Sequence, residues 1–383
     1  MKNMKMNKWT MGLAAAGVVT LSSVAQAQDA AAGAEALAAS TTLSGYVSTG
    51  YKYNNGAAGL GYFRAAEDRN AFSLDVVDLK LSSAQGDGAM DTGYTVELWM
   101  GPAAGDIGTA DTGVTDGTVE LMQANIDLRL NGIDLKVGQF GTVVGNEVYN
   151  YNENAFYTHS WGFAMEPTHH TGILASYTVS DDLQIGLGLA NSTTAAINAN
   201  STGSSKTVLA SVSYTLPSGT GALAGTELYY GFVSGDADGV SGDNDEYHYA
   251  SVALPELVAN LTTKVVWDHV EHVAGGDGAG KTSDIVGLYL SYSLNDTTTL
   301  NIRGEMGNLN TDTSTVTGGN GTVSSLGTGN ADNLQSWTIG LNHKIWDNVI
   351  SRIEYRHDEV DNTSGDTSDN QQDVVALNLI YTF

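Results

Sequence analysis

Apolar and polar residues alternate with a period of two along most of this chain, and this pattern constrains the fold more than any other feature. In the last segment, apolar residues occupy every second position from Val375 to Phe383. This period is typical of a β-strand with one apolar face. Sixteen such segments can be counted, near residues 42–53, 71–82, 92–100, 119–130, 133–144, 169–179, 183–190, 206–216, 222–233, 247–254, 260–270, 283–294, 299–308, 334–344, 348–358 and 373–383.

The connections between these segments alternate in length. Asn131-Gly132 and Trp346-Asp347 are short, whereas 145–168 and 309–333 are long. Outer-membrane barrels have short periplasmic turns, longer outer loops and an even strand number. The sequence therefore predicts an all-β fold, a transmembrane antiparallel up-and-down β-barrel of about sixteen strands around a water-filled lumen. Uncertain segment boundaries leave fourteen or eighteen strands open.

A large secreted β-sandwich or β-helix would also contain alternating strands. The regular alternation of loop lengths and the final Phe383 favour the barrel. Composition excludes other classes. The chain has no Cys, which rules out thiolate metal sites, disulfides and Cys nucleophiles. Its 43 acidic and 16 basic residues give a net charge of -27, which argues against nucleic-acid binding.

The N-terminus has the features of a secretory signal peptide. Three lysines precede an apolar stretch that ends at a small-residue cleavage motif, Ala25-Gln26-Ala27. After residue 27 no apolar run is long enough for a transmembrane helix. The expected organisation is a signal peptide at 1–27, a periplasmic lead-in at 28–41 and an outer-membrane barrel at 42–383.

Several stretches resemble the OmpL-like outer-membrane β-barrel porins: SGYVSTGYKYN, NAFSLDVVDLKL, VGQFGTVVGNEV, EPTHHTGILASYTVSDDLQIGLGLAN and SRIEYRHD. Together they spread over nearly the whole mature chain. The resemblance implies a barrel in the outer membrane of a Gram-negative bacterium that passes small hydrophilic solutes by diffusion, and it points to no particular solute. The final strand, with Tyr381 and Phe383, resembles the assembly signal of outer-membrane proteins.

Charged residues within the strands are expected to face the lumen. On a lipid face, Lys or Arg would cost roughly 2–4 kcal/mol each at the midplane. Acids and bases balance on this inner wall, so the acidic excess falls in loops, turns and ends. Acidic mouths concentrate cations, and we expect a weak cation preference that fades with salt. The expected pore-lining residues are Glu97, Asp127, Arg129, Asp134, Lys136, Lys264, Arg303, Glu305, Arg352, Glu354 and Arg356.

The loop at 145–168 is too aromatic for a freely solvated loop. It is the third outer loop, which in general porins folds into the lumen and narrows it. By that analogy its acids would face the bases Arg129, Lys136, Arg303, Arg352 and Arg356 across the constriction. A rim cap or a subunit interface are the alternatives for this loop. The expected constriction residues are Glu147, Glu153, Tyr157, Trp161 and Glu166.

No cofactor, metal or catalytic residue is expected. His159-Ser160 and His357-Asp358 are adjacent pairs, and neighbours in a strand point to opposite faces. The acidic loops at 234–246 and 358–373 offer oxygen ligands for Ca²⁺ but lack the spacing of a calcium loop.

The sequence therefore predicts a non-enzymatic porin for passive diffusion. A solute-specific or gated channel, for example for sugars that stack on the loop aromatics, is the alternative, and an outer-membrane hydrolase is a third interpretation. The expected partners are outer-membrane lipids, lipopolysaccharide, the assembly machinery and small hydrophilic solutes. Both a monomer and a homotrimer remain open.

Overall fold

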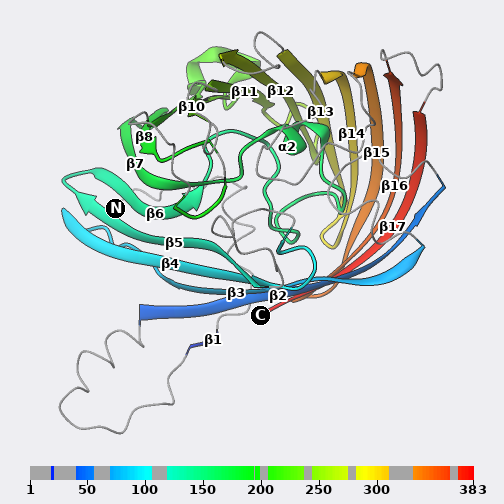
Figure 1. Cartoon of the computed structure of the whole chain (residues 1–383), viewed down its shortest axis with the longest axis horizontal. Coiled ribbons are helices and arrows are strands. Elements are labelled where there is room, and N and C mark those ends of the chain that lie inside the picture. The colour runs from blue at the N-terminus through cyan, green and yellow to red at the C-terminus, as the bar shows by residue number, and fades with distance from the viewer. Residues whose placement is uncertain are drawn as a thin grey trace, which may run out of the picture.

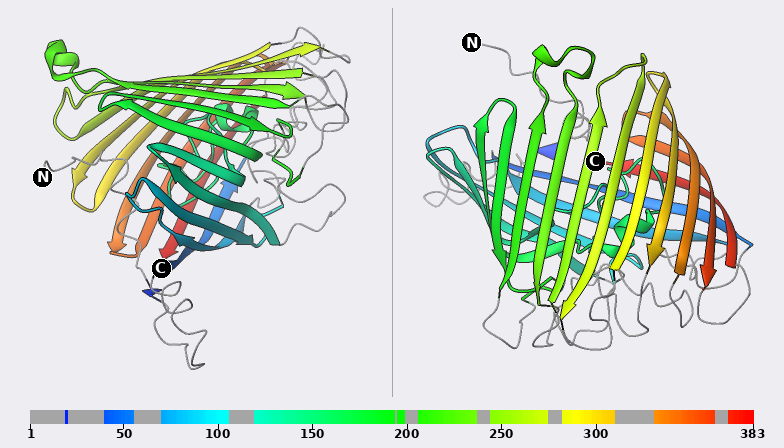
Figure 2. Two further views of the ribbon diagram at one scale, coloured as in Figure 1. Left: turned by 90° about the vertical axis from the view of Figure 1, so that its left-hand side faces the viewer. Right: turned by 90° about the horizontal axis from the view of Figure 1, so that it is seen from above.

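Sixteen antiparallel strands, β2 to β17, form a closed barrel. The computed structural model describes residues 19–20, 40–55, 70–105, 119–193, 195–198, 206–236, 244–274, 282–309, 331–362 and 370–383. Figure 2 shows the strands side by side in one continuous wall. The strands are β2 (Thr41–Asn54), β3 (Ala71–Ser83), β4 (Met90–Met100), β5 (Val119–Leu130), β6 (Ile133–Gly141), β7 (His169–Ser180), β8 (Leu183–Ala190), β9 (Thr207–Thr215), β10 (Glu227–Asp236), β11 (Asn244–Leu254), β12 (Leu261–Ala274), β13 (Thr282–Asn295), β14 (Thr298–Leu309), β15 (Ala331–Trp346), β16 (Val349–Asn362) and β17 (Asn370–Thr382).

Each strand pairs with its neighbours in the chain, and β17 pairs with β2 to close the ring. Closure pairs every strand edge, which an all-β protein needs in hydrocarbon. The main chain of Phe383 continues this seam, because its N–H and C=O both bond to Gly45 at 3.0 Å. The predicted sixteen-stranded barrel is confirmed.

Short elements outside the barrel wall complete the described fold. β1 (Val19–Thr20) pairs with β2 and falls within the predicted signal peptide, most of which lies outside the described residues. α2 (Trp161–Met165) belongs to the connection between β6 and β7. The 3-10 helix η2 (Ser218–Leu223) joins β9 to β10. Among the described residues, no helix is both long and apolar enough to cross a membrane.

Several predicted strand boundaries differ from the structure by a few residues, and two of them change what precedes or follows the strand. The strand expected at 222–233 begins at Glu227, because η2 occupies the residues before it. The strand expected at 133–144 ends at Gly141, because the chain turns into the barrel from Thr142. The loop expected from residue 145 therefore begins three residues earlier, which places Val143 and Val144 inside the barrel.

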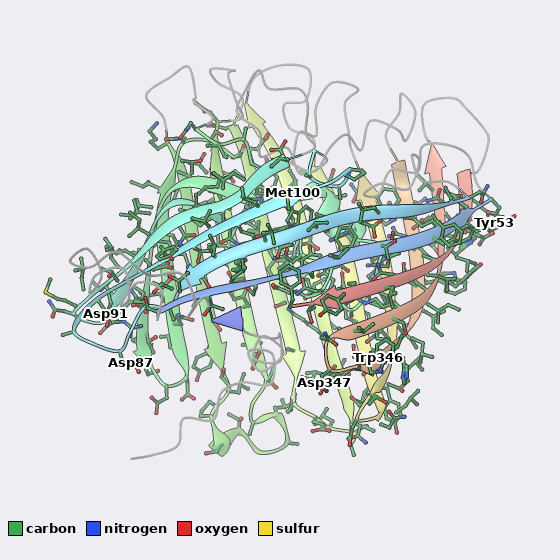
Figure 3. All side chains as sticks on the ribbon, turned by 90° about the horizontal axis from the view of Figure 1, so that it is seen from below. Tyr53, Asp87, Asp91, Met100, Trp346 and Asp347 are labelled. Carbon is green, nitrogen blue, oxygen red and sulfur yellow. The ribbon has the colours of Figure 1, made fainter. Side chains whose placement is uncertain are left out.

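The two faces of the strands differ as the alternation predicts. On β17, Val375 and Tyr381 are 40% and 48% exposed on the outside, while Ala376 and Ile380 are buried inside. The short connections lie at one end of the barrel; Figure 3 shows Asp87 and Asp91 at that end of the strands, and Tyr53 at the other. By the rule for outer-membrane barrels, the short-turn end faces the periplasm.

Several register shifts occur in the described sheet, and two of them lie well inside strands, where they interrupt the alternation. The register between β2 and β3 shifts beside Asp75, and the register between β4 and β5 shifts beside Met122. A bulge adds one residue to one strand and changes which face the following side chains meet. As a result Asp75 and Val76, although adjacent in sequence, are both buried.

Candidate functional site: the lumen and its constriction loop

The connection between β6 and β7, residues 142–168, lies inside the barrel; we call it the constriction loop. In Figure 1 it runs across the interior in green, and α2 lies beside β12 and β13. Gly145 allows this path because its φ is +103°, a backbone conformation that favours glycine. A Cβ there would also lie 2.2 Å from Oε2 of Glu166. The expectation that this loop enters the lumen agrees with its position.

Three arginines on the barrel wall bind main-chain carbonyls of the constriction loop. Arg352 donates from Nη1 to Tyr151 O and from Nη2 to Asn154 O, both at 2.7 Å. Arg303 donates to Thr158 O at 2.9 Å, and Arg356 donates to His159 O. All three side chains are buried, so the loop covers the charges that the sequence had placed at an open constriction.

Carboxylates on the same wall accept the loop's N–H groups. Glu354 accepts from Tyr157 N at 2.7 Å and from Thr158 N at 3.2 Å. Glu305 accepts from Trp161 N at 2.7 Å. Donors and acceptors of β14 and β16 thus alternate along the loop backbone. Such charge-assisted bonds are stronger than neutral ones and fix this segment of the loop to the wall.

The three acids of the constriction loop lie against three different parts of the barrel wall. Glu147 pairs with Arg303 on β14 at 2.7 Å. Glu153 lies near Lys80 and Glu97 on β3 and β4, and Glu166 lies beside Asp268 on β12. Among the described residues, Glu147 is the one of these three acids that pairs with an arginine. The structure therefore does not bring these acids together into one face opposite the bases.

These environments shift the acids' pKa values in different directions. Burial alone would raise the pKa of Glu147, but Arg303, His159 and the N–H of Ser160 hold it below its usual value. Burial raises the pKa of Glu153, partly offset by Lys80. Burial and the nearby Asp268 carboxylate raise the pKa of Glu166 well above its usual value, which favours its protonated form.

The loop aromatics are packed and do not line an open passage. Tyr149 and Tyr151 contact Trp99 of β4, with ring centroids 5.4 and 5.9 Å apart. Tyr157 donates from its hydroxyl to Asp75 at 2.7 Å, and Trp161 donates from Nε1 to Asp358 at 2.9 Å. All four side chains are buried, so in this structure none of them can stack on a passing sugar.

His159 lies at the centre of these contacts. Its ring stacks on Phe163 at 4.1 Å, and Nε2 lies 2.9 Å from Val148 O. Burial lowers the pKa of His159 to about 4, partly opposed by Glu147 and reinforced by Arg303 and Arg356. The ring is therefore neutral at physiological pH, and it has no role as a charge in the lumen there.

Four expected pore-lining residues form ion pairs near the short-turn end instead of approaching the loop. Asp127 and Lys136 are directly opposite each other on β5 and β6 and lie 2.8 Å apart. Arg129 and Asp134 are also opposite partners, 2.6 Å apart. The Lys136 and Asp134 side chains are 48% and 42% exposed, which indicates a solvated vestibule at this end of the lumen.

The remaining expected pore-lining residues, Glu97 and Lys264, lie on opposite sides of the loop. Glu97 on β4 is buried and accepts from Tyr149 Oη at 3.0 Å and from Asn150 Nδ2 at 3.1 Å. Lys264 on β12 is half-buried, with Nζ 5.9 Å from the Tyr249 ring centroid.

Sequence reasoning missed three wall residues that hold the loop. Asp75 is hidden from a period-two count by the bulge beside it. Trp99 is aromatic and would be expected on the lipid face, yet it is buried. Asp358 shares the parity of Arg356 and Glu354, so the alternation itself could have identified it; it pairs with Arg356 at 2.9 Å.

The described residues show no grouping of three or more His, Asp or Glu side chains that could hold a metal ion. His357 lies 2.8 Å from Asp373 and His269 lies 2.8 Å from Asp284. The acidic loops at 234–246 and 358–373, which offer oxygen ligands for Ca²⁺, lie partly outside the described residues.

Solved structures with this architecture are outer-membrane proteins. The outer membrane channel DcaP of Acinetobacter baumannii has a TM-score of 0.60 at 11% identity, covering 90% of this chain and 97% of its own. The anion-selective porin from Comamonas acidovorans has a TM-score of 0.58 at 12% identity, covering 90% and 99%. The trimer form of OmpT of Vibrio cholerae has a TM-score of 0.58 at 10% identity, also covering 90% and 99%. At these identities the likeness shows a shared fold.

No curated protein matches the sequence. One family profile does, over residues 40–383, and its description reads "Putative beta-barrel porin-2, OmpL-like". The match covers the whole barrel described above. The protein is thus an outer-membrane, multi-pass β-barrel with a porin-like channel fold, and it belongs to the OmpL-like beta-barrel porin-2 family.

Proposed function

We propose that this protein is a porin that lets small hydrophilic solutes and ions diffuse passively across the outer membrane. The observation that carries the proposal is the solvated charge inside a closed sixteen-stranded barrel. Lys136 and Asp134 remain about half exposed on the inner wall, although the constriction loop fills the interior beyond them. Barrels of this size leave an aqueous lumen, whereas eight-stranded barrels are filled by side chains.

A weak cation preference is part of this proposal. The ion pairs on β5 and β6 cancel their own charges. At the loop, Glu147 and Glu305 pair with Arg303, and Asp358 pairs with Arg356. The acidic excess of the whole chain, 43 acids against 16 bases, is therefore left to the mouths. Its field acts over about a Debye length and weakens as salt increases.

Single-channel conductance of the refolded mature protein in a planar bilayer tests the proposal. With a salt gradient across the bilayer, we expect a stable open current and a reversal potential on the cation side that decreases at high salt. A folded barrel that carries no current under any condition would contradict passive diffusion.

A gated channel is the second candidate, and a specific observation favours it. The constriction loop contacts the wall on several sides: Tyr157 bonds to β3, Arg352 of β16 bonds to the loop carbonyls, and Tyr229 of β10 donates to Val143 O at 2.6 Å. A loop held on several sides narrows the lumen more than a loop attached on one side.

Replacement of residues 147–165 by a short Gly-Ser linker separates the two candidates. A passive porin conducts before the replacement, and its current increases modestly. A gated channel is silent before it and conducts afterwards. Saturable block of the wild-type current by a sugar would support a solute-specific channel, and this requires the loop aromatics to leave their packed positions.

Processing and assembly form a further part of the proposal. We propose that residues 1–27 are removed on export, that 28–41 form a periplasmic lead-in, and that the assembly machinery reads the final strand. Tyr381 faces outward from that strand, with its ring 6.5 Å from that of Phe383.

The trimer form of the similar OmpT structure supports a homotrimer, and the exposed apolar belt supports contact with outer-membrane lipids and lipopolysaccharide. We propose no enzymatic activity.

A further inference from the structure

Three basic residues lie on one row that crosses the barrel wall. In the strand register, Lys264 of β12 is opposite Tyr289, which is opposite Arg303 of β14. Arg303 is in turn opposite Thr338, which is opposite Arg356 of β16. Neighbouring strands are about 4.8 Å apart, so successive bases on this row are separated by about 10 Å.

The constriction loop covers two of these three bases. Arg303 and Arg356 are fully buried, each with a loop carbonyl and a carboxylate as partners. Lys264 lies at the end of the row and is half-buried. In the part of the chain that the structure describes, no carboxylate oxygen lies within 4.0 Å of its ammonium. Lys264 is therefore the member of the row whose charge is not paired directly.

The acidic residues around Lys264 lie near its ammonium but not within ion-pair distance of it. Glu227 faces the lumen two strands away, separated in the register by Ala253, which has a small side chain. Asp268 lies four residues further along β12, beside the loop's Glu166. These three acids are the carboxylates that act on the charge of Lys264. A permeating ion beside the loop therefore meets one fixed cation among acids.

The other lumenal bases are less suited to act on ions. Arg352 is buried and bonded to carbonyls of the constriction loop. Lys136, Arg129 and Lys80 lie 2.8, 2.6 and 3.6 Å from a carboxylate. Lys344 pairs with Asp347 at a short turn, at 3.1 Å. Lys52 is buried against the loop, with Nζ 5.1 Å from the Tyr157 ring centroid. The field of a paired charge falls off faster with distance than that of a single charge.

We propose that Lys264 is the residue that sets the ion selectivity of this channel, by opposing the cation preference that the acidic mouths create. The buried arginines of the same row position the loop and do not act on permeating ions. This inference rests on the proposed function, because selectivity has meaning only for a conducting channel.

The first experiment compares Lys264→Gln with Lys206→Gln in the full mature chain, by reversal potential in a salt gradient. Lys206 is exposed in the connection before β9, so its substitution makes the same change in net charge outside the strands. For Lys264→Gln we expect the cation-to-anion permeability ratio to rise about threefold, the order expected for removal of a unit charge close to an ion in water. For Lys206→Gln we expect no more than a small change.

The second experiment uses the absence of Cys from the chain. Lys264→Cys introduces a single thiol that charged methanethiosulfonate reagents can modify in the open channel. A cationic reagent should return the permeability ratio toward the wild-type value, and an anionic reagent should raise it further. Thr338→Cys is the matched control, because Thr338 lies on the same row but is buried beneath the loop and should not react.

The outcomes separate the two proposals. If wild-type and variants all conduct but Lys264→Gln keeps the wild-type ratio, or if the two reagents act alike on the thiol introduced at position 264, then Lys264 does not set selectivity and the porin proposal stands. If a folded wild-type barrel never conducts, the proposed function fails and the selectivity inference fails with it. Reaction at position 338 would show that the arginine row is also open to the lumen, which would overturn the assignment of selectivity to Lys264 alone.

Discussion

Arg303 Nη1 lies 2.7 Å from Glu147 Oε1, and both side chains are buried inside the barrel. Arg303 belongs to the wall and Glu147 to the constriction loop, so this pair joins the two. Removal of one partner from such a pair leaves a buried charge, which typically costs about 3–5 kcal/mol. Replacement of both by apolar residues of similar volume often costs little.

We therefore expect Glu147→Ala to weaken docking of the loop by less than the cost of an uncompensated charge, about 3–5 kcal/mol, because Arg303 would lose its closest carboxylate but keep Glu305 at 3.2 Å. The current should become larger and noisier. The double variant Glu147→Leu with Arg303→Met should recover part of the wild-type behaviour. Single-channel recordings of the variants measure this, and equal effects of the single and double substitutions would count against the pair as the main anchor.

Arg352 holds the loop through its backbone, so its loss should act differently. Arg352→Ala leaves the carbonyls of Tyr151 and Asn154 without their charged donor, each bond to a charged group being worth about 1.5–3 kcal/mol. We expect an increased conductance and faster protease cleavage within 147–160. Arg352→Lys, which can satisfy only one carbonyl at a time, should give an intermediate effect. Cleavage at the wild-type rate in Arg352→Ala would exclude this anchoring role.

The wall of the barrel could be predicted from sequence because each strand repeats the same two-face signal many times. The position of Arg303 on the inner face follows directly from the apolar residues on either side of it. Its partner does not, because Glu147 lies in a loop without a repeating pattern. A bulge has the same effect locally, since one added residue beside Asp75 reverses the parity on which the face assignment depends.

The role of each charged residue in the lumen depends on which loop residues contact it. Alternation placed Arg303, Arg352 and Arg356 in the lumen, but it could not show that a loop covers them. The path of the 27 loop residues 142–168 through the lumen determines which basic residues permeating ions can reach. That path depends on long-range contacts such as Tyr157 with Asp75, for which no local sequence signal exists.

Acid should loosen the loop through His159. The pKa of His159 is lowered to about 4 when the loop is docked and returns toward 6.5 when the ring is solvated. Docking is then fully supported above pH 6.5 and weakens as the pH falls toward 4, by roughly 3 kcal/mol in total. Conductance measured between pH 7 and pH 4 should rise. His159→Gln should reduce this dependence, leaving the smaller acid response of Glu147, whose pKa is lowered.

A rise in pH should loosen the same loop through Glu166. Because its pKa is raised, docking is fully supported at low pH and weakens as the pH rises through the folded-state value. Ionised Glu166 would then face the Asp268 carboxylate. Glu166→Gln keeps a hydrogen-bond donor without the charge, so its conductance should stay constant where that of the wild type increases. An identical response to rising pH in both proteins would rule out this acid pair as the cause.

Close packing of the loop against β12 gives a purely steric test. A Cβ on Gly162 would lie 2.3 Å from Oδ2 of Asp268, whereas a Cβ on Gly304 would meet nothing within 4 Å. Gly162→Ala should therefore displace α2 from the wall, at a cost of about 1–3 kcal/mol for overpacking, and raise the conductance. Gly304→Ala makes the same chemical change in β14 and should leave it unaltered. If the two variants conduct alike, α2 does not pack against β12 in the membrane. The added methyl group at position 162 clashes with Asp268 only when the loop is docked.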